Sequence, residues 1–99
     1  MKLSDYLYHE EDGITLYCGD AREILPSIDY AETVLTDPVW PNAHPDLKGA
    51  GDPYKLFSDA LNVIPWTVQR IIVWLGVQSD PRFLTCVPKA YPFLRAQYL

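Results

Sequence analysis

Residues 31–36 read Ala-Glu-Thr-Val-Leu-Thr and run directly into Asp-Pro-Val-Trp at residues 37–40. The β-branched and apolar side chains of the first segment predict a central strand. Pro38 lacks a backbone donor, so we expect the strand to end at Asp37. A carboxylate and the ring of Trp40 would then lie at the carboxyl end of a strand, the edge of an open α/β sheet where ligands bind.

Strands and helices are predicted to alternate on both sides of this segment. Upstream, residues 14–18 form a strand, and Asp20 with Glu23 forms a capping box that begins a short helix ended by Pro26. Downstream, a proline-containing loop over residues 42–51 leads to further elements. These are a helix that begins at Asp52-Pro53, a strand over 70–75, a helix that begins at Asp80-Pro81, and a last strand over 94–99.

This order predicts an α/β fold, a Rossmann-like parallel sheet of four strands with flanking helices, in a single domain over residues 1–99. Phe57, Ala60, Leu61 and Ile64 have helical spacing and would face the sheet. Trp66 and Trp74 are expected to pack in the core. The last strand has no helix after it, which indicates that a second copy of the chain or a missing C-terminal half covers the sheet edge.

The dipeptide Asp-Pro occurs three times, and two of the three have a structural explanation. Asp52 and Asp80 each precede a helical pattern, so a capping role accounts for both. Asp37 precedes Pro41 and Pro45, which prevent a helix, and its alternatives are a turn that leaves the strand or a binding site. Asp20, just after the first strand, is expected to cap a helix and could also meet a ligand.

Composition and charge exclude several classes of protein. The chain has 99 residues, 48% of them hydrophobic and 13% aromatic, which is too apolar for a disordered tail. Its net charge of −5 is unfavourable for a simple nucleic-acid coat protein. Nine acids against two bases give residues 1–37 a net charge of −7, whereas residues 38–99 carry +2 and could meet an anionic surface.

No metal site or membrane segment is predicted. Cys18 and Cys86 lie far apart with no accompanying histidine cluster, so they are expected to be free thiols in a reducing compartment. No signal peptide is found, and no apolar run approaches the roughly 20 residues of a membrane span. We therefore expect a cytoplasmic protein without membrane contact.

Two stretches together resemble a known family. Residues 16–25 (LYCGDAREIL) and 34–40 (VLTDPVW) are similar to the opening of the amino-directed DNA methyltransferases, which methylate adenine N6 or cytosine N4. Many members begin with an LYxGDxxExL stretch and continue to a strand that ends in Asp-Pro-Pro-Tyr. The resemblance covers residues 14–40, and beyond them only the order of elements agrees.

The resemblance implies roles for the matching residues. Asp37 and the carbonyl of Pro38 would accept hydrogen bonds from the target amino group, and Trp40 would stack on a base flipped out of the DNA duplex. Asp20 and Asp37 would bind the cofactor S-adenosylmethionine, Asp20 through its adenosyl part. The partner would be DNA.

The sequence also departs from the family pattern. Val39 and Trp40 stand where the family usually has Pro and Tyr, and the glycine-rich Phe-x-Gly-x-Gly motif of the C-terminal half is not found. The resemblance therefore implies that these residues correspond to the N-terminal half of a methyltransferase domain. Two alternatives stay open: a catalytically inactive, truncated DNA- or protein-binding module, and a methyltransferase that acts on a protein amide or a small molecule.

Overall fold

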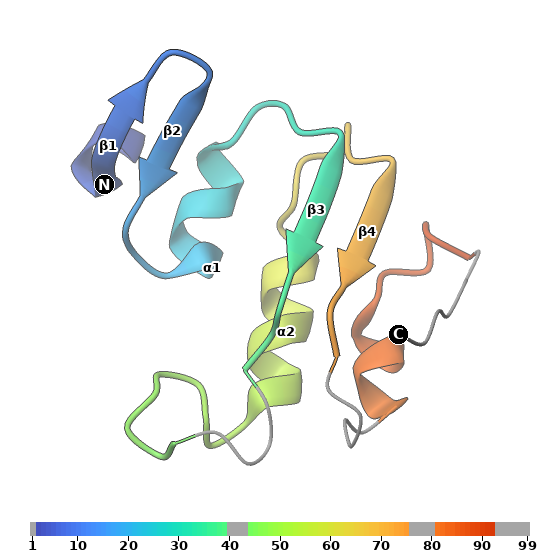
Figure 1. Ribbon diagram of the computed structural model, residues 1–99. Coiled ribbons are helices and arrows are strands. Elements are labelled where there is room, and N and C mark those ends of the chain that lie inside the picture. Colours follow the sequence, from blue (N-terminus) through green and yellow to red (C-terminus); the bar gives the residue numbers. More distant parts are fainter. Residues whose placement is uncertain (1, 40–43, 76–80, 93–99) are drawn as a thin grey trace.

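The computed structural model describes residues 2–39, 44–75 and 81–92, and it has a mixed α/β architecture (Figure 1). Short strands and helices alternate along most of it. In chain order the elements are the 3₁₀ helix η1 (Leu3–Tyr6), β1 (Leu7–Glu11), β2 (Ile14–Tyr17), α1 (Ala21–Ile24), the 3₁₀ helix η2 (Leu25–Ser27), β3 (Thr33–Thr36), α2 (Pro53–Leu61), β4 (Arg70–Val73) and the 3₁₀ helix η3 (Pro81–Cys86).

The centre of the structure is the unit β3–α2–β4. β3 and β4 pair in parallel, with Thr33 opposite Arg70 and Thr36 opposite Val73. α2 connects the two strands and lies against one face of the pair (Figure 1). The predicted strands over 31–36 and 70–75 and the predicted helix after Asp52 are therefore confirmed, each with somewhat shorter bounds.

The core lies between this sheet face, α2 and η3. Phe57, Leu61, Phe83 and Cys86 are buried together. The Phe83 ring lies 4.7 Å from the Tyr54 ring and 5.5 Å from the Phe57 ring, measured between centroids. Residues from the inner face of β4 and from the segments beside it pack around this cluster, namely Ile64, Ile71, Val73, Leu75 and Val87. The helical periodicity of α2 thus predicted its buried face correctly.

The first strand does not join the parallel sheet, so this part of the prediction is wrong. β2 pairs antiparallel with β1, and Gly13, with φ of 81°, occupies the tight turn between them. A two-residue turn lets neighbouring segments pair at a small cost in loop entropy. In the described residues the structure thus has two sheets of two strands each, and residues 7–11, all of them exposed, form a strand that the sequence pattern does not predict.

The second face of the parallel pair is open in the described part of the chain. Leu35 is 72% exposed, and Ile72 and Trp74 on the neighbouring strand are also exposed. Trp66 is 91% exposed, so the expectation that Trp66 and Trp74 pack in the core is wrong. Alternation along a strand sends every second side chain to each face, and among the described residues a helix covers only one of the two faces.

The remaining expectations are met in part or lie outside the described residues. The helix predicted after Asp80-Pro81 is the 3₁₀ helix η3, and the expected last strand over 94–99 is not among the described residues.

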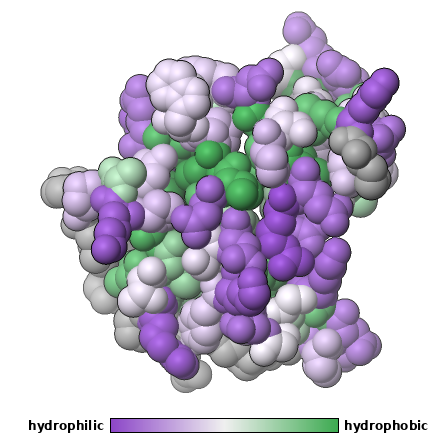
Figure 2. Space-filling model, turned by 180° about the vertical axis from the view of Figure 1, so that it is seen from behind, coloured by the Kyte–Doolittle hydropathy of each residue, from purple (hydrophilic) through white to green (hydrophobic). Residues whose placement is uncertain are grey.

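Viewed from the side opposite to Figure 1, the surface is mostly hydrophilic around smaller hydrophobic groups (Figure 2). No helix within residues 2–39, 44–75 and 81–92 is long and apolar enough to cross a bilayer.

Candidate functional site

A cavity of about 520 Å³ lies at the carboxyl end of β3. It is open to solvent and is lined by three segments and one side chain from a fourth. Its walls are Gly19, Asp20 and Ala21 before and in α1; Thr36, Asp37, Pro38 and Val39 at the end of β3; Pro53, Leu56, Phe57 and Ala60 of α2; and Lys48. Small-molecule sites commonly have this size, with mostly apolar walls and a few polar groups.

The cavity brings together three of the residues that the sequence singled out. Asp20, Asp37 and Pro38 all line it, although Asp20 belongs to a different sheet–helix junction from the other two. Trp40, the fourth predicted site residue, lies outside the described residues. The shared cavity makes a common role for the two carboxylates chemically reasonable.

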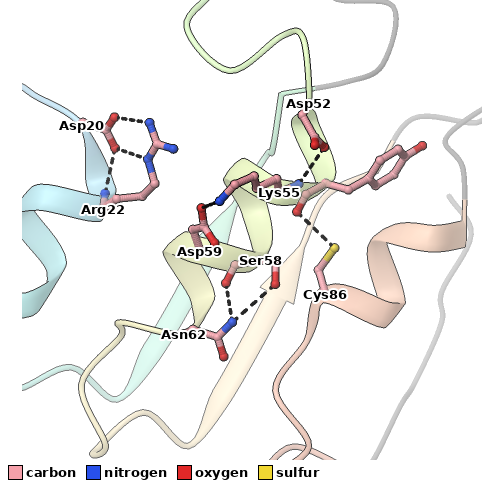
Figure 3. A network of polar contacts seen from close by, with 9 residues as sticks. Asp20, Arg22, Asp52, Lys55, Ser58, Asp59, Asn62 and Cys86 are labelled. Carbon is pink, nitrogen blue, oxygen red and sulfur yellow. Dashed lines mark hydrogen bonds and ion pairs between the residues drawn. The ribbon is translucent and has the colours of Figure 1, made fainter.

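Asp37 follows β3 directly and is exposed, whereas Pro38 is buried. The hydrogen bonding between β3 and β4 continues to the last residue of β3, because the Trp74 backbone N–H donates to the Thr36 carbonyl at 2.8 Å. Residues 37–39 have no regular structure. Asp52, by contrast, begins α2 and accepts a hydrogen bond from the Lys55 backbone N–H at 3.1 Å, as expected for a cap (Figure 3). Within the described residues, Asp37 therefore caps no helix.

Asp20 has a defined structural role at the start of α1. Its Oδ1 accepts hydrogen bonds from the Arg22 backbone N–H at 2.9 Å and from Arg22 Nε at 3.0 Å. Its Oδ2 accepts from Arg22 Nη2 at 2.7 Å and lies 3.0 Å from Lys48 Nζ. Figure 3 shows the carboxylate and the guanidinium facing each other. The predicted cap is confirmed.

The environment of Asp20 strongly favours its charged form. Only 6% of the side chain is exposed. The hydrogen bonds from the Arg22 side chain and backbone, with a smaller contribution from Lys48, lower the pKa of this carboxyl far below its ordinary value, although burial acts in the opposite direction. Asp20 is thus an anion whose charge is compensated by two cations.

The approach of η1 explains the glycine before Asp20. A Cβ atom on Gly19 would lie 2.6 Å from Cδ1 of Tyr6, closer than side-chain packing allows. The Tyr6 hydroxyl donates to Glu23 at 3.0 Å. The capping box expected between Asp20 and Glu23 is not the observed cap, because the Asp20 side chain accepts from the Arg22 backbone N–H; Glu23 instead connects α1 to the N-terminal segment. Packing against Tyr6 therefore accounts for Gly19, and capping of α1 accounts for Asp20, without reference to a ligand.

Lys48 is the residue of this site that sequence reasoning did not find. It stands in the irregular loop after the prolines, and nothing around it has a recognisable spacing. The neighbouring residue Gly49 is a turn signal in the sequence. In the structure it has a φ of 87°, a conformation that favours glycine. Only the folded chain brings this loop to Asp20, which lies far away in the sequence.

The other chemically notable side chains do not add to the site. His9 and His44 lie on the surface, each beside an acid at 3.6 Å. Cys18 is exposed and Cys86 is buried, and both are free thiols. Within the described residues no three His, Cys, Asp or Glu side chains are grouped so that they could hold a metal ion.

Comparison with known proteins adds no identification. No protein-family model, curated protein or solved structure matches this chain. The features that bear on function are therefore the cavity, the residues that line it, and the two short stretches that resemble the methyltransferases.

Proposed function

We propose that the chain carries the base-binding part of a DNA methyltransferase, which transfers a methyl group from S-adenosylmethionine to the exocyclic amino group of adenine or cytosine. The observation that supports this most directly is that Asp20, Asp37 and Pro38 line one cavity at the carboxyl end of β3. In this proposal β3–α2–β4 is part of a Rossmann-like sheet, for which that edge is the usual binding edge.

The described residues are chemically compatible with the cofactor. S-adenosylmethionine supplies a methyl group on a positively charged sulfur and presents hydroxyl and amino donors. The cavity offers the carboxylates of Asp20 and Asp37 together with an apolar wall of Leu56, Phe57 and Ala60 from α2. Asp20 and Asp37 would hold the cofactor.

Asp37 and Pro38 would position the target amine. The Asp37 carboxylate and the Pro38 carbonyl accept its hydrogen bonds, which leaves the nitrogen lone pair directed at the methyl group. Such a site works by orientation and electrostatics and needs no covalent intermediate. The role of Trp40, to stack on the flipped base, depends on the resemblance alone.

The first experiment measures binding and methyl transfer. We expect calorimetry to detect micromolar binding of S-adenosylmethionine to the purified protein. Asp37→Ala should abolish incorporation of radiolabelled methyl groups into duplex DNA without unfolding the protein. Asp46→Ala is the matched control, since it removes the same charge from an exposed loop position outside the cavity. Wild-type turnover in Asp37→Ala would contradict the catalytic assignment.

A second experiment addresses base flipping. Trp40→Ala should reduce the rise in fluorescence of 2-aminopurine placed at the target position in DNA, because the flipped base loses a stacking partner. Base–aromatic stacking contributes about 1–3 kcal/mol in single-strand binders, so the effect should be large. An unchanged signal would exclude the stacking role.

The alternative function is a binding module that transfers no methyl group. One observation favours it: the hydrogen-bond acceptors of Asp20 are already occupied by Arg22 and Lys48. Calorimetry separates the two functions, because a module would bind DNA or a protein without binding S-adenosylmethionine.

A further inference from the structure

The carboxylate of Asp20 has no acceptor position left for a ligand. A carboxylate offers about four lone-pair sites. In the structure Oδ1 accepts two donors from Arg22, and Oδ2 accepts one from Arg22 and one from Lys48. A ligand that donates a hydrogen bond to Asp20 must therefore replace one of these partners.

Arg22 is the less replaceable of the two partners. It is two residues from Asp20, and its backbone N–H is part of the cap of α1. Its guanidinium makes a two-pronged contact through Nε and Nη2, the geometry in which arginine binds carboxylates most strongly. Removing it would also disturb the helix start.

Lys48 is held differently. It makes a single contact of 3.0 Å, its side chain is 72% exposed, and it comes from the loop that precedes α2. An exposed ammonium regains its hydration on release, and pairs of this kind contribute only about 0.2–1 kcal/mol. Unlike Arg22, Lys48 also lines the cavity itself.

The loop that carries Lys48 is fixed by its own turns. The Ala50 backbone N–H donates to the Leu47 carbonyl at 3.0 Å, and that of Asp52 donates to Gly49 at 3.1 Å. A Cβ atom on Gly49 would collide with the side chain of Leu56, which lines the cavity from α2. The backbone next to Lys48 is thus packed against the cavity wall, and exchange at Asp20 requires movement of the lysine side chain only.

We propose that Lys48 is a positioning residue that occupies the exchangeable acceptor site of Asp20, and that a ligand binds by replacing its ammonium with a hydroxyl or amino donor. This inference rests on the proposed function, in which the donor belongs to the adenosyl part of S-adenosylmethionine. One charge-assisted hydrogen bond is lost and one hydrogen bond is formed, with no covalent change. Lys48 therefore lowers ligand affinity. Before the ligand binds, it keeps the buried carboxylate of Asp20 paired.

The test compares the affinity for S-adenosylmethionine of the wild type with that of Lys48→Met. We expect Lys48→Met to bind about two- to fivefold more tightly, the range that corresponds to release of an exposed ion pair. The difference should shrink as salt is added, because salt weakens the competing pair in the wild type. Lys55→Met is the matched control: Lys55 pairs with Asp59 at 2.7 Å, is 68% exposed and lies outside the cavity, so its affinity should not change.

A second background separates competition from a general effect of the substitution. In Asp20→Asn, which keeps an oxygen for the cap, Lys48→Met should no longer raise the affinity. Equal or weaker binding by Lys48→Met in the wild-type background would overturn the inference while leaving the proposed function intact. Absence of wild-type binding would overturn the proposed function, and this inference with it.

Discussion

Asp20 and Asp37 stand at two strand ends and face the same cavity, yet their surroundings differ. The side chain of Asp20 is almost fully buried, caps α1 and contacts two cations. Asp37 is exposed, follows a strand, and precedes no helix in the described residues. Helix capping and ion pairing explain the presence of Asp20, whereas capping does not explain the presence of Asp37.

In the proposed function, an acid with a structural role and an acid that binds the substrate share one site. A carboxylate that stabilises the fold has its acceptors filled, so it can bind a ligand only by exchange. A carboxylate at an irregular strand end contributes little to helix formation and can be aimed at a substrate.

The largest expected effect is on stability. Asp20→Ala removes the cap of α1 and the partner of Arg22, and we expect the free energy of unfolding to fall by about 2 kcal/mol, the upper range for loss of a cap. Asp37→Ala should lower it by less, because Asp37 caps no helix in the described residues. Urea denaturation measures both. Equal losses in the two variants would remove the distinction.

A smaller effect is expected at the turn that holds Lys48 near Asp20. Gly49→Ala places a side chain in the left-handed region, which costs about 1–2 kcal/mol, and brings its Cβ against Leu56. Gly13→Ala is the control, since Gly13 has a similar φ of 81° but open space around it. Thermal unfolding should show the greater loss for Gly49→Ala. A larger loss for Gly13→Ala would mean that Leu56 adapts and that the turn is not packed as described.

The smallest expected effect is a dependence on acid. The pKa of Asp20 is lowered in the folded protein, chiefly by Arg22, so its contribution to stability is complete above its unfolded value of about 4 and is lost as the pH falls toward the folded value. Asp20→Asn lacks this titration. Denaturation between about pH 6 and pH 3 should therefore give a flatter stability profile for Asp20→Asn than for the wild type. Parallel profiles would contradict the charged, paired state of Asp20.

The sequence predicted local features well and pairings less well. The caps at Asp20 and Asp52, the strand before Asp37 and the buried face of α2 follow from neighbouring residues, and the structure has them. The antiparallel partner of β2 is not predicted, because residues 7–11 have no alternating hydrophobic pattern and only the turn at Gly13 brings them beside β2. The exposure of Trp66 was also missed, since hydrophobicity alone does not specify which face is covered.

What the sequence determined by itself is the end of β3 and the starts of α1 and α2, and with them the two acids of the site, because caps, prolines and apolar spacing act over a few residues. What only the tertiary structure decided is that Asp20 and Asp37 share one cavity and that Lys48 reaches Asp20. Those contacts join residues far apart in the chain, and they exist only because β3, α1 and α2 pack in this arrangement.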